Sequence, residues 1–343
     1  MTCAHAMSEY LETIESLKKR FKIAAITDDW LGHPIVVFKT GGREEPPVLV
    51  TAGSSGVEVA GVYAALELTL QVDVERTVYI LPSRDPTGFH EASYILSRIL
   101  GENVIVESIA DLRKLLTGVG AEFLLDADDL FLATFKGIGI AASYSLDAYE
   151  AAKLIEKEIQ SQELTDTLDG ARILITGRSP RTEGEGEMSH FLTVFAKEGR
   201  IFTYDDFSVE TVPEVDFVKN FVDREDLGMV VDLHESKNSP GFYVSQSEEP
   251  SSGELTILYL VLDQVQQYGM ELASRETLES MGLKVLTEGL GCGKGHCGLV
   301  DYVTGKTYAF AFSTPMDKPL ESRIRTLNVA TLSALNAFAI AYV

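Results

Sequence analysis

The sequence predicts an α/β fold in which helices cover both faces of a mixed central sheet. Short apolar runs typical of buried strands occur at Val48–Val50, Val78–Leu81 and Met229–Leu233. The first run ends in the small and polar residues AGSSG, and an apolar helical segment, Val57–Gln71, follows it. Strands that alternate with helices form layered α/β folds, whose functional loops lie at the strand ends.

The remaining periodic segments supply the other elements of this fold. An amphipathic helix is expected over Ser8–Phe21, because its large apolar residues share one face. The segments IAAI and PIVVFKT are expected to be strands that flank the turn DDWLGH. Further helices are expected at Val215–Val222, Glu254–Glu271 and from Leu320 onward, and further strands at Leu283–Leu286 and Tyr308–Phe312.

We expect residues 1–343 to form a single domain, within which residues 90–200 follow a different pattern. Helical stretches at Ile109–Leu116 and Leu146–Gln160 precede the polar segment TGRSPRTEGEGEMSH. This pattern indicates a helical insertion in the domain or a lid that flanks a site. Extra packing on the edge of the sheet is an equal alternative.

The charge of the chain excludes several classes of partner. With 29 basic and 52 acidic residues, the formal net charge is −23, which repels nucleic acid and anionic membrane surfaces. Three cysteines and no basic-then-apolar leader at the first residues predict a cytoplasmic protein without a disulfide framework. The uncharged stretch Thr326–Val343 contains interspersed polar residues, so we interpret it as a buried terminal helix and not as a membrane anchor.

Polar residues follow three of the predicted strands. Ser55 and Glu58 come after the first central strand, Arg84 and Asp85 after the second, and His234 directly after VVDL. Because a strand is buried while its end opens into a crevice, residues at these ends are candidates for a common site.

These segments resemble, in order, the zinc carboxypeptidase family of carboxypeptidase A, including its succinylglutamate desuccinylase and aspartoacylase relatives. VLVTAGSSGVEVAG resembles the strand, turn and helix that carry the family's His-x-x-Glu zinc motif, and VVDLHES the strand of its second zinc histidine. The resemblance also covers FKIAAITDDWLGHPIVVFKTG, SRDPTGF, CGLVDYVTGKTYAFAFSTP and PLESRI. It implies the fold of this family and a metal-dependent hydrolase of amide or peptide bonds.

The resemblance also implies roles for single residues, several of which depart from the family pattern. Glu58 and His234 correspond to two metal ligands, whereas Ser55 stands where the family has its first zinc histidine and Ser313 where it has its catalytic glutamate. Arg84 and Asp301 are the candidate substrate-binding residues. A serine hydroxyl is neutral and a poor zinc ligand, so zinc binding is expected to be weak.

Three functions follow from these departures. The first is a divergent metallohydrolase that acts on a small peptide or acylated amino-acid-like substrate, with a further ligand from solvent, from Ser55 or from the loop that contains Cys292, His296 and Cys297. The second is a catalytically inactive relative that uses the cleft for binding. The third is a metal-free hydrolase that uses Ser55 and His234.

Overall fold

The computed structural model describes residues 4–161, 164–178, 188–208, 212–295 and 298–341. By their internal contacts the residues group into two compact units, and the single domain expected from the sequence stays a prediction. One unit contains Ser55–Val57, Asp85–Val212 and the start of the chain; the other contains Ser8–Ser54, Glu58–Arg84 and Pro213–Val343. We call them the inserted unit and the main unit.

The main unit is built on a nine-stranded mixed sheet with the order β1-β2-β4-β3-β11-β15-β12-β14-β13. Its centre is parallel, since β4, β3, β11 and β15 run in one direction, while β2 and β12 pair antiparallel to this central group. The strands are β1 (Lys22–Asp28), β2 (Pro34–Gly41), β3 (Glu44–Ala52), β4 (Arg76–Leu81), β11 (Met229–Ser236), β12 (Tyr243–Gln246), β13 (Lys284–Thr287), β14 (Leu290–Cys292) and β15 (Tyr308–Pro315).

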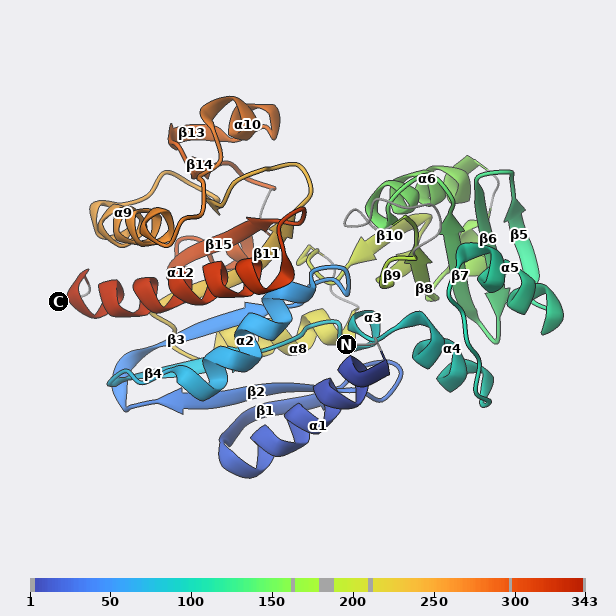
Figure 1. The fold of residues 1–343 in the computed structure, drawn as a ribbon, viewed down its shortest axis with the longest axis horizontal. Helices are drawn as coiled ribbons and strands as arrows, with labels where there is room; N and C mark the ends of the chain where they lie inside the picture. Colours follow the sequence, from blue (N-terminus) through green and yellow to red (C-terminus); the bar gives the residue numbers. More distant parts are fainter. Residues whose placement is uncertain (1–3, 162–163, 179–187, 209–211, 296–297, 342–343) are drawn as a thin grey trace. The chain divides into compact units, whose positions relative to one another are not determined.

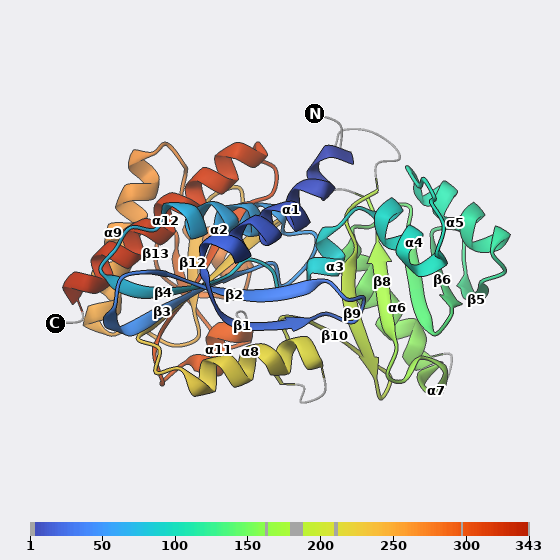
Figure 2. The same ribbon diagram turned by 90° about the horizontal axis from the view of Figure 1, so that it is seen from below.

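Helices cover both faces of this sheet, as the sequence predicts (Figures 1 and 2). Figure 2 shows α2 and α12 on one side of the strands and α8 and α11 on the other. The helices of the main unit are most of α1 (Ala4–Arg20), α2 (Val59–Gln71), α8 (Pro213–Arg224), α9 (Ser252–Gln267), α10 (Arg275–Ser280), α11 (Gly298–Val303) and α12 (Leu320–Ala341).

The main core lies between the sheet and helices α2, α9 and α12. Alternate residues of β11, namely Met229, Val231 and Leu233, join it from the sheet, and Leu327 and Phe338 join it from α12. Among the described residues, α12 is the one helix with the length and apolar composition of a membrane span, and half of that apolar window is buried inside the protein. Such burial is typical of a core helix.

The inserted unit contains helices at the two stretches where the sequence predicts them, but it also contains a six-stranded sheet, so residues 90–200 are not purely helical. The strand order is β10-β9-β8-β7-β6-β5, with β7 and β8 parallel and the other pairs antiparallel. The strands are β5 (Glu122–Asp126), β6 (Leu130–Phe135), β7 (Ile138–Ser143), β8 (Arg172–Thr176), β9 (Leu192–Lys197) and β10 (Arg200–Thr203). The helices are α3 (Pro86–Phe89), α4 (Ala92–Leu100), α5 (Ile109–Gly118), α6 (Ala148–Ser161) and α7 (Thr165–Leu168).

Two tight hairpins explain why this segment forms a sheet. Lys136 and Gly137 link β6 to β7, and Glu198 and Gly199 link β9 to β10, with positive φ at all four residues. Two-residue turns with both residues at positive φ match the twist of paired strands. The sequence therefore carried hairpin signals here that the helical interpretation overlooked.

Candidate functional site

Glu58 lies at the start of α2, after the turn that follows β3. It occupies the N-cap position, yet its side chain makes no hydrogen bond to its own helix. The amide of Ala60 in the first turn of α2 instead donates to Glu235 Oε2 on β11 at 2.7 Å. Because a neighbouring strand supplies this cap, the Glu58 carboxylate can face the end of the sheet.

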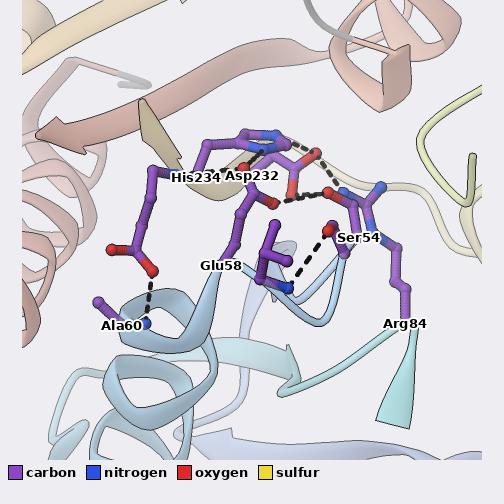
Figure 3. Close-up of polar contacts among 9 residues, drawn as sticks. Ser54, Glu58, Ala60, Arg84, Asp232 and His234 are labelled. Carbon is purple, nitrogen blue, oxygen red and sulfur yellow. Dashed lines mark hydrogen bonds and ion pairs between the residues drawn. The ribbon is translucent and has the colours of Figure 1, made fainter. Parts of the chain in front are cut away.

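His234 meets Glu58 at this end of the sheet. Its Nδ1 lies 3.3 Å from Glu58 Oε1, and its Nε2 lies 3.0 Å from Asp232 Oδ2 (Figure 3). Asp232 and His234 are two residues apart on β11, so their side chains leave the same face of the strand. Both ring nitrogens of His234 therefore face carboxylate oxygens.

Arg84 completes a chain of charged groups that begins at Glu58. It follows β4, and its Nη2 lies 2.9 Å and 3.1 Å from the two carboxylate oxygens of Asp232. Both side chains are 1% exposed. A charge pair that is removed from water in this way depends strongly on each partner, because the loss of one leaves the other uncompensated.

The surroundings shift the pKa of two of these groups. Burial disfavours the carboxylate of Asp232, but Arg84 and His234 outweigh it and lower the pKa of this residue. Burial likewise disfavours the imidazolium of His234, but the negative charges of Asp232 and Glu58 outweigh it and raise the pKa well above its usual value. The main unit therefore favours a protonated His234 when no metal is bound.

Glu58 also has local hydrogen-bond donors. The Ser54 hydroxyl donates to Oε2 at 3.0 Å, and the amide of Glu235 donates to Oε1 at 3.3 Å. The residue is 5% exposed. These donors fix its orientation toward His234, as Figure 3 shows.

Two of these residues fit the requirements of a divalent metal such as zinc. Ligand atoms on one tetrahedral zinc lie roughly 3–3.5 Å apart, and the separation of 3.3 Å between His234 Nδ1 and Glu58 Oε1 lies in this range. Asp232 holds the other ring nitrogen, which is the usual second contact of a metal-binding histidine. Within the described part of the main unit, Glu58 and His234 thus fit as two ligands of such a metal.

The structure places the other predicted residues at different points of the fold. Ser313 lies on β15 beside His234 in the strand register and is 4% exposed. Asp301 lies on α11, where its carboxylate accepts hydrogen bonds from Ser247 and from the amide of Gly295. Ser55 groups with the inserted unit, and its hydroxyl oxygen accepts a hydrogen bond from the amide of Val57 at 3.3 Å.

The remaining predictions concern Arg84 and the loop that contains Cys292, His296 and Cys297. A substrate carboxylate could bind Arg84 only if Asp232 shared its guanidinium, so this predicted role stays a prediction. Cys292 ends β14 and is buried, whereas His296 and Cys297 lie outside the described residues.

Asp232 is the site residue that the sequence analysis missed. It was treated as part of the apolar run VVDL, although a carboxylate two residues before a histidine on one strand shares a face with it. The pattern Asp-x-His at a strand end was the signal that could have identified it.

Comparisons with known proteins found similar structures but no similar sequences. No family model matches the sequence, and no curated protein matches it. A candidate carboxypeptidase A from Shewanella denitrificans superposes with a TM-score of 0.50 at 10% identity, over 97% of this chain and 68% of the other.

Two further solved structures are similar to this chain. A candidate metallopeptidase from the same organism superposes with a TM-score of 0.49 at 14% identity, over 95% of this chain and 87% of the other. A metallo-carboxypeptidase from Pseudomonas aeruginosa, in complex with (2-guanidinoethylmercapto)succinic acid, gives 0.47 at 12% identity over 97% and 68%. With its mixed sheet and helices on both faces, the chain has a metallo-carboxypeptidase-like fold.

Proposed function

We propose that this protein is a divergent hydrolase of the metallo-carboxypeptidase fold, which cleaves an amide or peptide bond of a small substrate. The observation that supports it best is the contact of Glu58 with His234, whose other nitrogen is held by Asp232. This arrangement joins two metal-ligand types to an orienting carboxylate at the carboxyl end of a parallel strand, where α/β proteins place their sites.

The chain's own residues have defined parts in this proposal. Glu58 and His234 would hold the metal, which when bound polarises a carbonyl and lowers the pKa of water. Asp232 fixes the ring of His234, and Ser54 and the amide of Glu235 fix Glu58. Ser313, beside His234, is neutral and cannot take the place of the glutamate that accepts the proton in the resembled family. A general base of this kind contributes roughly 10²–10⁴-fold to the rate. We therefore expect slow turnover.

The proposed substrate class is a short peptide or an acylated amino acid. The test is to incubate the purified protein with panels of both compounds and with zinc, and to follow product formation by mass spectrometry. The proposal expects hydrolysis that EDTA abolishes and that His234→Gln and Glu58→Gln both remove. Turnover that survives both substitutions would contradict the assignment of this site.

A second candidate function is supported by the charge balance of the same residues. Arg84 and a protonated His234 balance the carboxylates of Glu58 and Asp232 without any metal. This favours a relative without catalytic activity that uses its cleft for binding. Saturation-transfer NMR with the same two panels separates the candidates, because the binding protein would retain ligands that it does not cleave.

The third candidate, a metal-free hydrolase with Ser55 as nucleophile, stays a prediction. Within its own unit, the Ser55 hydroxyl oxygen accepts a hydrogen bond from the Val57 amide. A serine-directed phosphonate that labels wild type but not Ser55→Ala would support this function.

A further inference from the structure

The loop between β3 and α2 takes part in both compact units. Ser54 and Glu58 belong to the main unit, whereas the tripeptide between them, Ser55–Val57, belongs to the inserted unit. The Ser54 hydroxyl donates to Glu58 Oε2 at 3.0 Å, so the two residues that flank the tripeptide are joined at the candidate site (Figure 3). The inserted unit therefore holds the middle of a loop that leads directly to a candidate metal ligand.

Gly56, at the centre of this tripeptide, lies directly against the main chain of Gly88. A Cβ atom at Gly56 would overlap the carbonyl group of Gly88, so only glycine permits this approach. Both residues are buried, and both belong to the inserted unit. Main-chain atoms cannot rotate out of the way as the end of a flexible side chain can. The contact therefore fixes how these two segments lie against each other.

Gly88 is itself held by close contacts within the inserted unit. It lies in the short helix α3, where its amide donates to Asp85 Oδ1 at 2.8 Å. A Cβ atom at Gly88 would overlap the carboxylate of Asp85 and would lie 2.7 Å from the carbonyl oxygen of Phe191. Phe191 directly precedes β9, and its side chain is fully buried. A series of close main-chain contacts thus leads from the start of β9 through Gly88 to Gly56.

The tripeptide transmits the position of Gly56 to Glu58. Val57 is buried, and its amide donates to the Ser55 hydroxyl oxygen at 3.3 Å, so the link from Gly56 to Glu58 has little conformational freedom. Glu58 Oε1 in turn lies 3.3 Å from His234 Nδ1. Side chains that share a metal must be held within about 0.5 Å of their working geometry. A methyl group at Gly56 that pushes the loop away from Gly88 would exceed this tolerance.

We propose that Gly56 and Gly88 are positioning residues of the candidate metal site, and that the inserted unit sets the position of the Glu58 carboxylate through the tripeptide Ser55–Val57. A structural change in α3 then alters the contact of Glu58 with His234. The consequence for metal binding rests on the proposed function, whereas the positioning of Glu58 against His234 does not.

Nitrogen-15 NMR of the His234 ring, recorded on the metal-free protein at one fixed pH, tests the positioning. Nδ1 faces Glu58 and Nε2 faces Asp232, so the two resonances report separately on the two contacts. We expect Gly56→Ala to shift the Nδ1 resonance more than the Nε2 resonance, because the added methyl group displaces the loop and leaves Asp232 on β11 in place. The signals are assigned with His234→Gln. An unchanged Nδ1 resonance in folded Gly56→Ala overturns the proposal.

Gly118→Ala is the matched control for this measurement. Gly118 ends α5 in the same unit, and a Cβ atom there would meet no atom of the described residues within 4 Å. We expect neither ring resonance to move in this variant. A shift of Nδ1 in Gly118→Ala as large as that in Gly56→Ala would mean that the resonance does not report on the loop, which also overturns the proposal.

Calorimetric zinc titration of the same proteins tests the consequence for metal binding. Groups that orient a metal ligand typically contribute about 10–100-fold to metal affinity, so we expect Gly56→Ala to bind zinc at least about tenfold more weakly than Gly118→Ala. If wild type binds no zinc, the proposed metal function fails, and the NMR comparison still decides the positioning. A shifted Nδ1 resonance with unchanged zinc affinity would contradict the role of Glu58 as a ligand and support the positioning alone.

A second pair of variants covers the case that Gly56→Ala does not fold, judged by circular dichroism. Gly88→Ala displaces α3, and Val57→Ala loosens the buried link between Gly56 and Glu58. We expect each of them to shift the Nδ1 resonance more than the Nε2 resonance. Equal positions of Nδ1 in wild type and in whichever of these variants is folded contradict the proposal.

Discussion

His234 Nε2 and Asp232 Oδ2 lie 3.0 Å apart on the same face of β11. Asp232 in turn is held by Arg84, so the orientation of the imidazole depends on a residue from another strand end. The histidine is thus positioned by a chain of contacts that extends into the interior of the main unit.

Restoring a histidine at position 55 is expected to increase zinc affinity. The resemblance implies that position 55 is that of the family's first zinc histidine, so Ser55→His should supply a third ligand, and we expect a gain of at least about tenfold, or 1.4 kcal/mol. The measurement is calorimetric zinc titration of wild type and variant, with Ser280→His as the control because Ser280 is exposed at the end of α10. Equal zinc affinities in wild type and Ser55→His would mean that position 55 is not the missing ligand. We expect no peptidase activity from Ser55→His alone, because Ser313 does not supply a base; the double variant Ser55→His with Ser313→Glu is the minimal change.

The buried pair of Arg84 and Asp232 is expected to contribute strongly to stability. Arg84→Met leaves the Asp232 carboxylate without its main partner, and we expect the free energy of unfolding to fall by about 3–5 kcal/mol. The exposed pair of Arg224 with Glu225 provides the matched control, since Arg224→Met should cost under about 1 kcal/mol. Urea denaturation measures both losses. Equal losses in the two variants would mean that the buried pair contributes no more to stability than the pair of Arg224 with Glu225.

The stability of the metal-free protein is expected to depend on pH through His234. Its pKa is raised in the folded state, so the protonated ring stabilises the fold fully below the unfolded value of about 6.5. This contribution is lost as the pH rises from about 6.5 through the raised pKa of the folded state. The free energy of unfolding of EDTA-treated wild type and His234→Gln, measured by urea denaturation at several pH values in this interval, gives its size. The difference between the two proteins should shrink with rising pH, and a difference that grows would contradict the assignment.

Glu235 is expected to be needed for folding more than for catalysis. It caps α2 through Ala60 and pairs with Arg323, whose side chain is 2% exposed. Glu235→Gln leaves that guanidinium uncompensated, which should cost about 3–5 kcal/mol. Thermal and urea denaturation test this, with Glu279→Gln as the control because Glu279 forms an exposed pair with Arg275. A loss for Glu235→Gln as small as that of the control would disprove the structural role.

The sequence predicted the main unit well because its signals were local and regular. Apolar runs such as Val48–Val50 and the strand end at His234 determined both the central strands and the meeting of His234 with Glu58. The hairpins at Lys136 and Gly137 and at Glu198 and Gly199 were overlooked, because the amphipathic helices beside them dominated the pattern.

The charge network was harder to predict, since it joins residues distant in sequence. Arg84 and Asp232 are 148 positions apart, and the sequence analysis considered Arg84 as a residue that binds substrate. Only the pairing of β3 with β4 and β11 brings them together.

His234 and Glu235 are consecutive on β11, so their side chains leave opposite faces of the sheet. His234 contacts the carboxylate of Glu58, and Glu235 caps helix α2 through the amide of Ala60. A strand alternates its faces with every residue, so a single insertion or deletion within β11 would exchange these two tasks. A change of length within the segment from Asp232 to Glu235 should therefore be more damaging than a single substitution there, because it would misplace every one of these side chains at once. Related chains that carry this site should vary in length at the loops around β11 and not within it.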